Sequence, residues 1–297
     1  MRAPVRPVRG QWPTPLEKRW GRFFRLDPRV ILHDDTTPDD FREAMTSIYV
    51  GGTIKITGSG RHPETGQLLM DTIDLSDATI VDIGASDGST SVDLVEQIGD
   101  FRRYVIADLY ISLRAVDVGS RTVLFDDEGT CVLVAGNRLM AWPDLSVPVR
   151  RLYSFVIKKA RTQLGSAREV LLLNPSARRL IRDDERVDYR KHDVFGPWDG
   201  PKPDVIKVAN LLRRLYFSDD DLLRALVALR ENLPEGGHLV LVDNPRIRNT
   251  PPRAGIFRRE AQRLIEVARL GEPEIADLVA RVGDQGADTM VSRSARE

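Results

Sequence analysis

The chain has 297 residues, of which 41% are hydrophobic and 30% are charged, and its 44 basic and 44 acidic residues give no net charge. This length suits one large α/β domain with additions or two small domains, and the charge balance does not favour binding to nucleic acid. A single cysteine, Cys131, excludes an internal disulfide, and the four histidines show no metal-ligand spacing, so we expect no metal. Because there is no apolar run of ~20 residues and no secretory signal, we expect a cytoplasmic protein.

The first 70 residues differ in character from the rest. Residues 1–15 are rich in proline and arginine and are typical of a mobile tail. Residues 16–24 and 38–49 have helical patterns, and Thr37-Pro38 is a helix start signal. We therefore expect residues 1–70 to form an N-terminal tail and helical cap, and residues 71–297 to form the main domain.

The main domain opens with a strand, a glycine turn and a helix. Thr79-Ile80-Val81 predicts a buried strand that ends near Asp82, and Gly84 and Gly88 bracket the turn that follows. Residues 89–98 then have a helical pattern. A turn at the carboxyl end of such a strand is where open α/β sheets bind nucleotide-type ligands.

The turn does not have the fingerprint of a dinucleotide site. Its spacing is G-x-x-x-G rather than G-x-G-x-x-G, with Ser86 inside the turn, and the carboxylate of Asp87 would repel a phosphate. Asp82 suits a ligand that presents a cation or amine instead. In these residues the chain resembles the class I S-adenosylmethionine-dependent methyltransferases, whose first motif is an acid followed by such a glycine loop. The resemblance implies that Asp82, Gly84, Ser86 and Gly88 bind this cofactor.

A second strand is predicted at residues 104–107 and ends in Asp108, which lies 20 residues after Gly88. At this spacing a doubly wound fold places an acid on the two hydroxyls of a ribose. The alternative is an ordinary surface acid at a strand end. We assign Asp108 to the ribose and include the adjacent Leu109 in the cofactor site.

Residues 114–165 interrupt the alternation of strands and helices and are predicted to be an insertion. Residues 122–125 and 131–135 form a predicted β-hairpin. Residues 147–164 form a predicted basic amphipathic helix with Val149, Leu152, Phe155 and Val156 on one side. Such a helix contacts a membrane surface or a protein, or packs on a sheet with its cations in solvent.

Further strands are predicted at residues 169–174 and 187–195. The family resemblance implies that Asp193 accepts a hydrogen bond from the adenine amino group and that the N–H group of Val194 contacts the ring. His192 is a candidate base or a structural residue.

The stretch from residue 203 to residue 242 reads as a strand, a helix over 222–233, a Pro-x-Gly-Gly turn and another strand. This order resembles the fourth and fifth strands of the same family, and it implies that Asn210 faces the transferred methyl group. The Tyr-Phe-Ser-Asp-Asp run at 216–220 resembles the branch that acts on hydroxyl or carboxyl acceptors. Nucleic-acid amino-methyltransferases carry an Asn/Asp-Pro-Pro-aromatic run, which is missing after Ala209.

At the C-terminal end, residues 264–270 and 274–282 fit either a hairpin or, in the second segment, a helix. We choose the hairpin because the resemblance places one there. The predicted fold class is thus α/β: a Rossmann-like, doubly wound, mostly parallel sheet with a closing antiparallel C-terminal strand, an N-terminal helical cap and an inserted β-hairpin and helix.

The predicted function is methyl transfer from S-adenosylmethionine to a small-molecule acceptor, with a hydroxyl or carboxyl group as the target. His192, His238 and Asn244 are candidate bases at strand ends, and none is assigned as catalytic. One alternative is a non-catalytic regulatory protein that binds S-adenosylmethionine. Another is an NAD(P)-dependent oxidoreductase, against which Ser86 and Asp87 argue.

Overall fold

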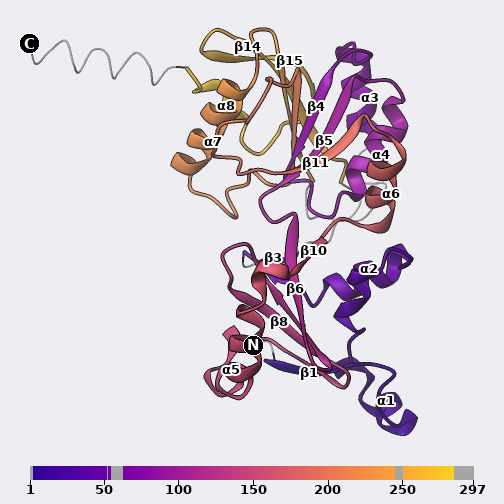
Figure 1. Cartoon of the computed structure of the whole chain (residues 1–297). Helices are drawn as coiled ribbons and strands as arrows, with labels where there is room; N and C mark the ends of the chain where they lie inside the picture. Colours follow the sequence, from indigo (N-terminus) through magenta and orange to yellow (C-terminus); the bar gives the residue numbers. More distant parts are fainter. Residues whose placement is uncertain (1–2, 52, 55–62, 245–249, 284–297) are drawn as a thin grey trace, which may run out of the picture. The chain divides into compact units, whose positions relative to one another are not determined.

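The computed structural model describes residues 3–51, 53–54, 63–244 and 250–283. The chain divides into two compact units (Figure 1). The first unit consists of Met1–Thr57 and Tyr110–Arg179, and the second unit consists of Gly58–Leu109 and Leu180–Glu297. This division differs from the expected boundary at residue 70, because the N-terminal segment and the insertion expected over 114–165 belong together in one unit with its own sheet.

The second unit contains a seven-stranded sheet in the order β11-β5-β4-β12-β13-β14-β15. Its first five strands are parallel, and its last two are antiparallel to their neighbours. The strands are β4 (Thr79–Ile83), β5 (Arg103–Asp108), β11 (Val187–Lys191), β12 (Val205–Ala209), β13 (His238–Asp243), β14 (Arg253–Glu260) and β15 (Arg263–Leu270).

Helices lie on both faces of this sheet (Figure 1). They are α3 (Pro63–Thr72), α4 (Ser89–Ile98), α7 (Asp219–Asn232) and α8 (Ala276–Ala280), while α6 (Pro175–Asp183) crosses the division between the units. The predicted helix over 222–233 is confirmed, and its leucines enter the core beside Ile206 and Val208 of β12. Ser218 and Asp221 form a capping box that fixes the first turn of α7.

The predicted C-terminal hairpin is wrong in its second strand. Residues 264–270 do form a strand, but β15 pairs with β14, and residues 276–280 form helix α8. Ile275, Leu278 and Val279 are buried against the core that contains α7. Their helical spacing decided the structure of this segment, because only a helix turns all three toward α7.

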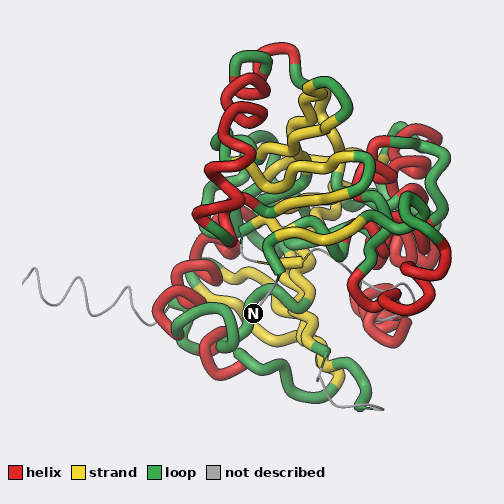
Figure 2. The backbone as a smooth tube through the Cα atoms, turned by 90° about the horizontal axis from the view of Figure 1, so that it is seen from below, coloured by secondary structure: helices red, strands yellow, loops and turns green. Residues whose placement is uncertain are grey.

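The first unit contains a six-stranded antiparallel sheet in the order β1-β9-β8-β7-β6-β10. Figure 2 shows all strands of the described chain in yellow and all helices in red. The strands are β1 (Val5–Pro7), β6 (Ser112–Val118), β7 (Arg121–Phe125), β8 (Cys131–Gly136), β9 (Leu139–Ala141) and β10 (Arg168–Leu171). The predicted hairpin is confirmed as β7 and β8. The predicted mobile tail is wrong, because Val5–Pro7 pairs with β9 as an edge strand, where proline is tolerated.

Two larger helices cover this sheet, α2 (Pro38–Met45) on one core cluster and α5 (Val147–Arg161) on another. The remaining elements are α1 (Thr14–Trp20), the two-stranded β2 (Tyr49–Val50) and β3 (Thr53–Ile54), and short 3-10 turns at Gly21–Phe23, Pro28–Leu32, Pro143–Leu145 and Leu164–Ser166. Within the described ranges, none of these helices has the length and apolar character needed to cross a bilayer.

The packing face of α5 differs from the predicted one. Val156, Ile157 and Ala160 are buried against the sheet, whereas Leu152 and Phe155 are each 76% exposed. Of the expected apolar side, only Val156 enters the core.

Cys131 lies in the core cluster beneath α5. Burial raises the pKa of its thiol to about 12, because a thiolate there would be removed from water. We therefore expect a thiol reagent at pH 8 to modify Cys131 roughly 1000-fold more slowly in the native protein than in urea, since only the thiolate reacts. The reaction can be followed by absorbance with Ellman's reagent. Equal rates in the two conditions would show that α5 does not cover this strand.

Candidate functional site

The candidate site lies at the carboxyl ends of the parallel strands of the second unit. In chain order, the five parallel strands occupy the sheet as third, second, first, fourth and fifth, so the direction of winding reverses between β4 and β12. Ligands of open α/β sheets bind outside the carboxyl ends of the strands at this reversal. The turn at residues 84–88 follows β4, and Asn210 follows β12. The topology therefore brings the two predicted segments to one place.

The turn at 84–88 has an unusual backbone. Gly84, Ser86 and Gly88 all have positive φ values, at 75°, 61° and 76°. Glycine adopts this conformation without strain, whereas Ser86 adopts it at a cost. The N–H group of Ser86 donates to Asp108 Oδ2 at 2.9 Å, which holds the serine in place. The structure thus joins two predicted site residues directly.

The N–H groups of this turn are engaged within the protein. Those of Gly84 and Ala85 donate to the carbonyl oxygen of Ala107, and that of Gly88 donates to the carbonyl oxygen of Ala85. With the bond from Ser86 to Asp108, the N–H groups of Gly84, Ala85, Ser86 and Gly88, four of the five in the turn, have internal acceptors. A phosphate-binding loop directs such N–H groups at its ligand, and this turn does not.

The start of α4 is occupied by the protein's own carboxylate. Asp87 is buried, and its Oδ1 accepts a hydrogen bond from the N–H group of Ser89 at 3.1 Å. The N-terminus of a helix carries a partial positive charge that often binds phosphate. Here Asp87 takes that position, which supports the sequence-based argument against a dinucleotide.

Asp108 is the last residue of β5, and Leu109 follows it beside the turn. Asp108 is largely buried and accepts from Ser86, whereas Leu109 is 37% exposed. A carboxylate offers about four acceptor positions, so the bond to Ser86 is compatible with further bonds to ligand hydroxyls. An exposed leucine next to it provides an apolar surface.

Asp193 and Val194 follow β11, which is the neighbour of β5. The N–H group of His192 donates to the carbonyl oxygen of Asp108 at 3.1 Å, so the two strand ends are joined. The side chain of Asp193 is exposed and its Oδ1 accepts from the N–H group of Phe195, while Val194 is buried. These residues lie at the same edge of the sheet as Asp108.

The two histidine candidates differ in position. His192 is buried against Trp198, and burial lowers its pKa, which favours the neutral ring. His238 begins β13 and lies at the opposite edge of the sheet from the turn, so it is excluded as a base at this site. Burial also lowers the pKa of His238.

Asp82 does not face a ligand cation as expected. It is 1% exposed, and its Oδ2 accepts from Lys207 Nζ at 2.8 Å, Ser91 Oγ at 2.8 Å and Tyr104 Oη at 3.0 Å. Lys207 is 3% exposed and lies opposite Asp82 in the register of β12 and β4. Burial raises the pKa of Tyr104 well above its ordinary value, so the phenol remains a donor. The cation that partners Asp82 is therefore Lys207, and the pair joins β4, β12, β5 and α4.

Asn210 is held by the neighbouring strand end. It has a φ of 57°, and its Oδ1 accepts from the N–H group of Asn244 at 2.7 Å. The next residue, Leu211, packs so closely on Gly84 that an added Cβ there would lie 2.8 Å from Leu211 Cδ2. Gly84 is thus required by a contact within the chain, and Leu211 lies at the turn where the cofactor was expected.

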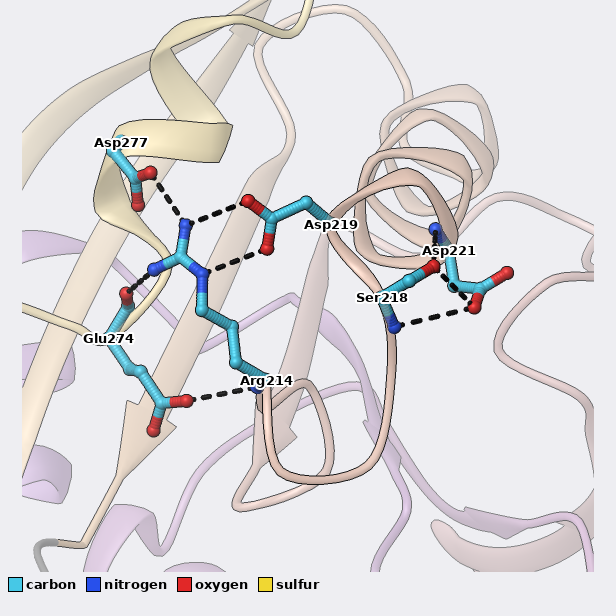
Figure 3. A network of polar contacts seen from close by, with 6 residues as sticks. All are labelled: Arg214, Ser218, Asp219, Asp221, Glu274 and Asp277. Carbon is cyan, nitrogen blue, oxygen red and sulfur yellow. Dashed lines mark hydrogen bonds and ion pairs between the residues drawn. The ribbon is translucent and has the colours of Figure 1, made fainter.

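The segment after Asn210 is fixed by ionic contacts with the region around α8 (Figure 3). Arg214 Nη2 lies 2.6 Å from Asp277 Oδ2, Arg214 Nε lies 2.8 Å from Asp219 Oδ1, and the Arg214 N–H group donates to Glu274 Oε1. Hydrogen bonds to Asp219 and Asp277 raise the pKa of Arg214. Arg213 adds bonds to Glu274 Oε2 and to the carbonyl oxygen of Asn244. This network holds the segment that carries Asn210 and Leu211 against the end of β13.

No protein-family model matches the chain, and no curated protein matches it. Similar solved structures include an O-methyltransferase from neocarzinostatin biosynthesis in complex with S-adenosyl-L-homocysteine and 1,4-dihydroxy-2-naphthoic acid (12% identity, TM-score 0.32, 60% of this chain and 35% of that chain). Human N-acetylserotonin methyltransferase in complex with S-adenosylmethionine is similar at 13% identity and a TM-score of 0.31, over 63% of this chain and 36% of that chain. The mitomycin 7-O-methyltransferase is similar at 19% identity and a TM-score of 0.33, over 75% of this chain and 44% of that chain.

All three structures are methyltransferases, the class of protein that the sequence resembles. The chain spans less than half the length of each of them. Similarity at this level assigns no activity to the chain, which is argued below from its own residues.

Sequence reasoning missed Lys207, Leu211 and Arg214. Lys207 had a usable signal, because a lysine within the apolar run 205–208 needs a buried acid. Asp82 is the matching acid in the neighbouring strand. Leu211 and Arg214 gave no comparable signal, since their partners come from distant parts of the sequence.

Proposed function

We propose that the second unit binds S-adenosylmethionine at the turn over residues 84–88 and transfers its methyl group to a small-molecule hydroxyl or carboxyl acceptor. The observation that carries this proposal is the internal bonding of the turn's N–H groups together with the carboxylate of Asp87 at the start of α4. These features oppose a phosphate and suit a cationic, phosphate-free adenosyl ligand.

The remaining site residues fit such a ligand in a consistent order. In this proposal the strand order is that of a Rossmann-like sheet, Asp108 accepts from the ribose hydroxyls, and Asp193 accepts from the adenine amino group. The N–H group of Val194 contacts the ring, and Leu109 packs on it. Ser86 and Gly88 shape the turn, and Asn210 lies toward the transferred methyl group. Asp82 positions the turn through Ser91 and Lys207 and does not touch the cofactor.

Methyl transfer from a sulfonium depends mainly on how the protein positions the reacting groups. The bound sulfonium supplies an activated methyl group, and in-line alignment of the reacting groups contributes about 7–11 kcal/mol to lowering the barrier. A carboxylate acceptor needs no general base, whereas a hydroxyl acceptor gains from one. In this proposal the residues named above bind the cofactor, and none of them is assigned as a general base. The Arg214 network holds the segment that follows Asn210 against Glu274 and Asp277.

Calorimetry with S-adenosylmethionine and with S-adenosylhomocysteine tests the proposal. Replacing Asp108 with alanine should weaken binding by about 1–3 kcal/mol, through the loss of charge-assisted hydrogen bonds to the ribose. The exposed Asp100, changed to alanine, is the control and should leave binding unchanged.

Other outcomes would redirect the assignment. Tight binding of NADH without binding of the sulfonium ligand would replace the proposal with an oxidoreductase. Binding of S-adenosylmethionine with no methyl transfer to a broad panel of hydroxyl and carboxyl acceptors would favour a non-catalytic regulatory protein. The contact between Leu211 and Gly84 is the observation that favours this second candidate, because the chain's own side chain covers part of the turn.

A further inference from the structure

Helix α5 of the first unit carries several cationic side chains that do not belong to its buried face. Its buried face consists of Val156, Ile157 and Ala160. Among its other residues are five cations and no acid: Arg150, Arg151, Lys158, Lys159 and Arg161. In a chain with no net charge, this is a local concentration of positive charge.

Two large apolar side chains lie exposed among these cations. Leu152 and Phe155 are each 76% exposed and lie three residues apart, so they share one side of the helix. Phe155 has Arg151 four residues before it and Lys158 and Lys159 three and four residues after it, which places cations around the ring. Leu145 and Val147, just before and at the start of α5, are also about half exposed. We call Leu152 and Phe155 together with Arg151, Lys158 and Lys159, the cations on the same side of the helix, the α5 surface.

The cations of the α5 surface have no acidic partner in the part of the chain that the structure describes. None of the five cations of α5 forms an ion pair there, although arginines elsewhere, such as Arg214 and Arg186, pair with nearby acids. The nearest acids in sequence are Asp144 before the helix and the hairpin turn over 126–128. Asp126 uses its Oδ1 to accept from the N–H group of Thr130 within that turn. The positive charge of the helix is therefore not neutralised by ion pairing within the described residues.

We propose that the α5 surface lies on an anionic lipid surface, with Leu152 and Phe155 inserted at the level of the headgroups and the cations against the lipid phosphates. Interleaved apolar and basic residues on one side of a helix suit this environment, because the lysine and arginine stems can lie along apolar surface while their charges reach the headgroups. A second protein is a poorer fit. Two large apolar side chains offer roughly 300 Å², whereas the apolar part of a stable interface is roughly 450 Å² of the about 800 Å² buried on each partner.

Vesicle flotation with the full chain tests this proposal independently of methyl transfer. Vesicles of phosphatidylcholine with phosphatidylserine are compared with vesicles of phosphatidylcholine alone, at low and high salt. We expect flotation only with the anionic vesicles and its loss at high salt. The double variant Lys158→Glu/Lys159→Glu should bind at least roughly 30-fold more weakly, since each basic residue near the surface contributes a several-fold gain. Leu152→Ser/Phe155→Ser should also lose flotation.

Matched variants separate this surface from general effects. Lys18→Glu/Arg19→Glu makes the same change in net charge at exposed positions on α1, and Leu215→Ser removes an exposed leucine of the second unit. Both should float like the unaltered protein, and circular dichroism should show that all variants are folded. The proposal is overturned if the unaltered protein ignores anionic vesicles, or if the α1 variant loses flotation as fully as the α5 variant. A dimer in light scattering that Leu152→Ser/Phe155→Ser dissociates, without vesicle binding, would identify a second copy as the occupant.

Discussion

Replacing Lys207 with methionine is expected to lower the free energy of unfolding of the second unit by about 3–5 kcal/mol. Methionine keeps the apolar stem but leaves the carboxylate of Asp82, which is 1% exposed, without its cation. The hydrogen bonds from Ser91 and Tyr104 remain, yet neither neutralises a buried charge. Urea denaturation followed by circular dichroism measures the change.

Two comparisons make this expectation specific. The double variant Asp82→Asn/Lys207→Met removes both charges and should recover much of the lost stability. Arg103 and Asp188 form an ion pair between β5 and β11 whose side chains are about half exposed. Arg103→Met should therefore cost no more than about 1 kcal/mol. If Lys207→Met and Arg103→Met had similar effects, the burial argument for the Asp82–Lys207 pair would be wrong.

Replacing Gly84 with alanine is expected to destabilise the second unit by about 2–5 kcal/mol. The positive φ of 75° contributes about 1–2 kcal/mol for any residue with a Cβ. The close contact with Leu211 Cδ2, at 2.8 Å from the added atom, contributes about 1–3 kcal/mol more, as in other overpacked sites. Because the N–H group of Gly84 is bonded to Ala107, the backbone cannot move away without losing that bond. Thermal and urea unfolding both report the effect.

Gly236 provides the matched control for this experiment. It has a φ of 79° in the same unit, and an added Cβ would meet no atom within 4 Å. Gly236→Ala should therefore show the backbone cost alone. In a Leu211→Ala background, Gly84→Ala should fall to the level of Gly236→Ala. An unchanged cost in that background would mean that Leu211 does not set the requirement for glycine.

The parts of the fold that were predicted well are those whose signal is local. The buried strand before Gly84, the strand before Asp108 and the capped helix α7 are each specified by a short run of residues with a clear period. Helix α8, which replaces the predicted second strand of the C-terminal hairpin, also has a local signal in the sequence. Ile275, Leu278 and Val279 have helical spacing. There, the helical period agrees with helix α8, whereas the second hairpin strand implied by the family resemblance does not form.

The parts that were missed depend on pairing between distant residues. Val5 lies opposite Ala141 in the sheet of the first unit. No feature of residues 1–15 predicts pairing with a strand so distant in the sequence. A three-residue strand with a proline at its end is too short to show a period. As a result, the sequence predicts a tail and a cap for the N-terminal segment, rather than a strand of the sheet that contains the insertion.

The site shows the same contrast. Asp108 was placed by its spacing from Gly88, and the structure brings it to Ser86 of the same turn. The run of residues around Asp82 does not reveal its partner, because a buried charge is satisfied across strands. Pairing Lys207 with Asp82 requires knowing that β12 lies beside β4.

The alternation of the two units along the chain has a consequence for how the molecule responds to cleavage. Each unit is assembled from two separate segments, with junctions near residues 57, 109 and 179. A protease that cuts once at any of these junctions severs the chain but removes no unit, because each fragment retains strands or helices that are packed into a partner segment on the other fragment. The nicked molecule would stay together as a non-covalent complex until it was denatured. The segments of the two units therefore alternate along the sequence. Removing residues from one end of the chain does not give either unit by itself.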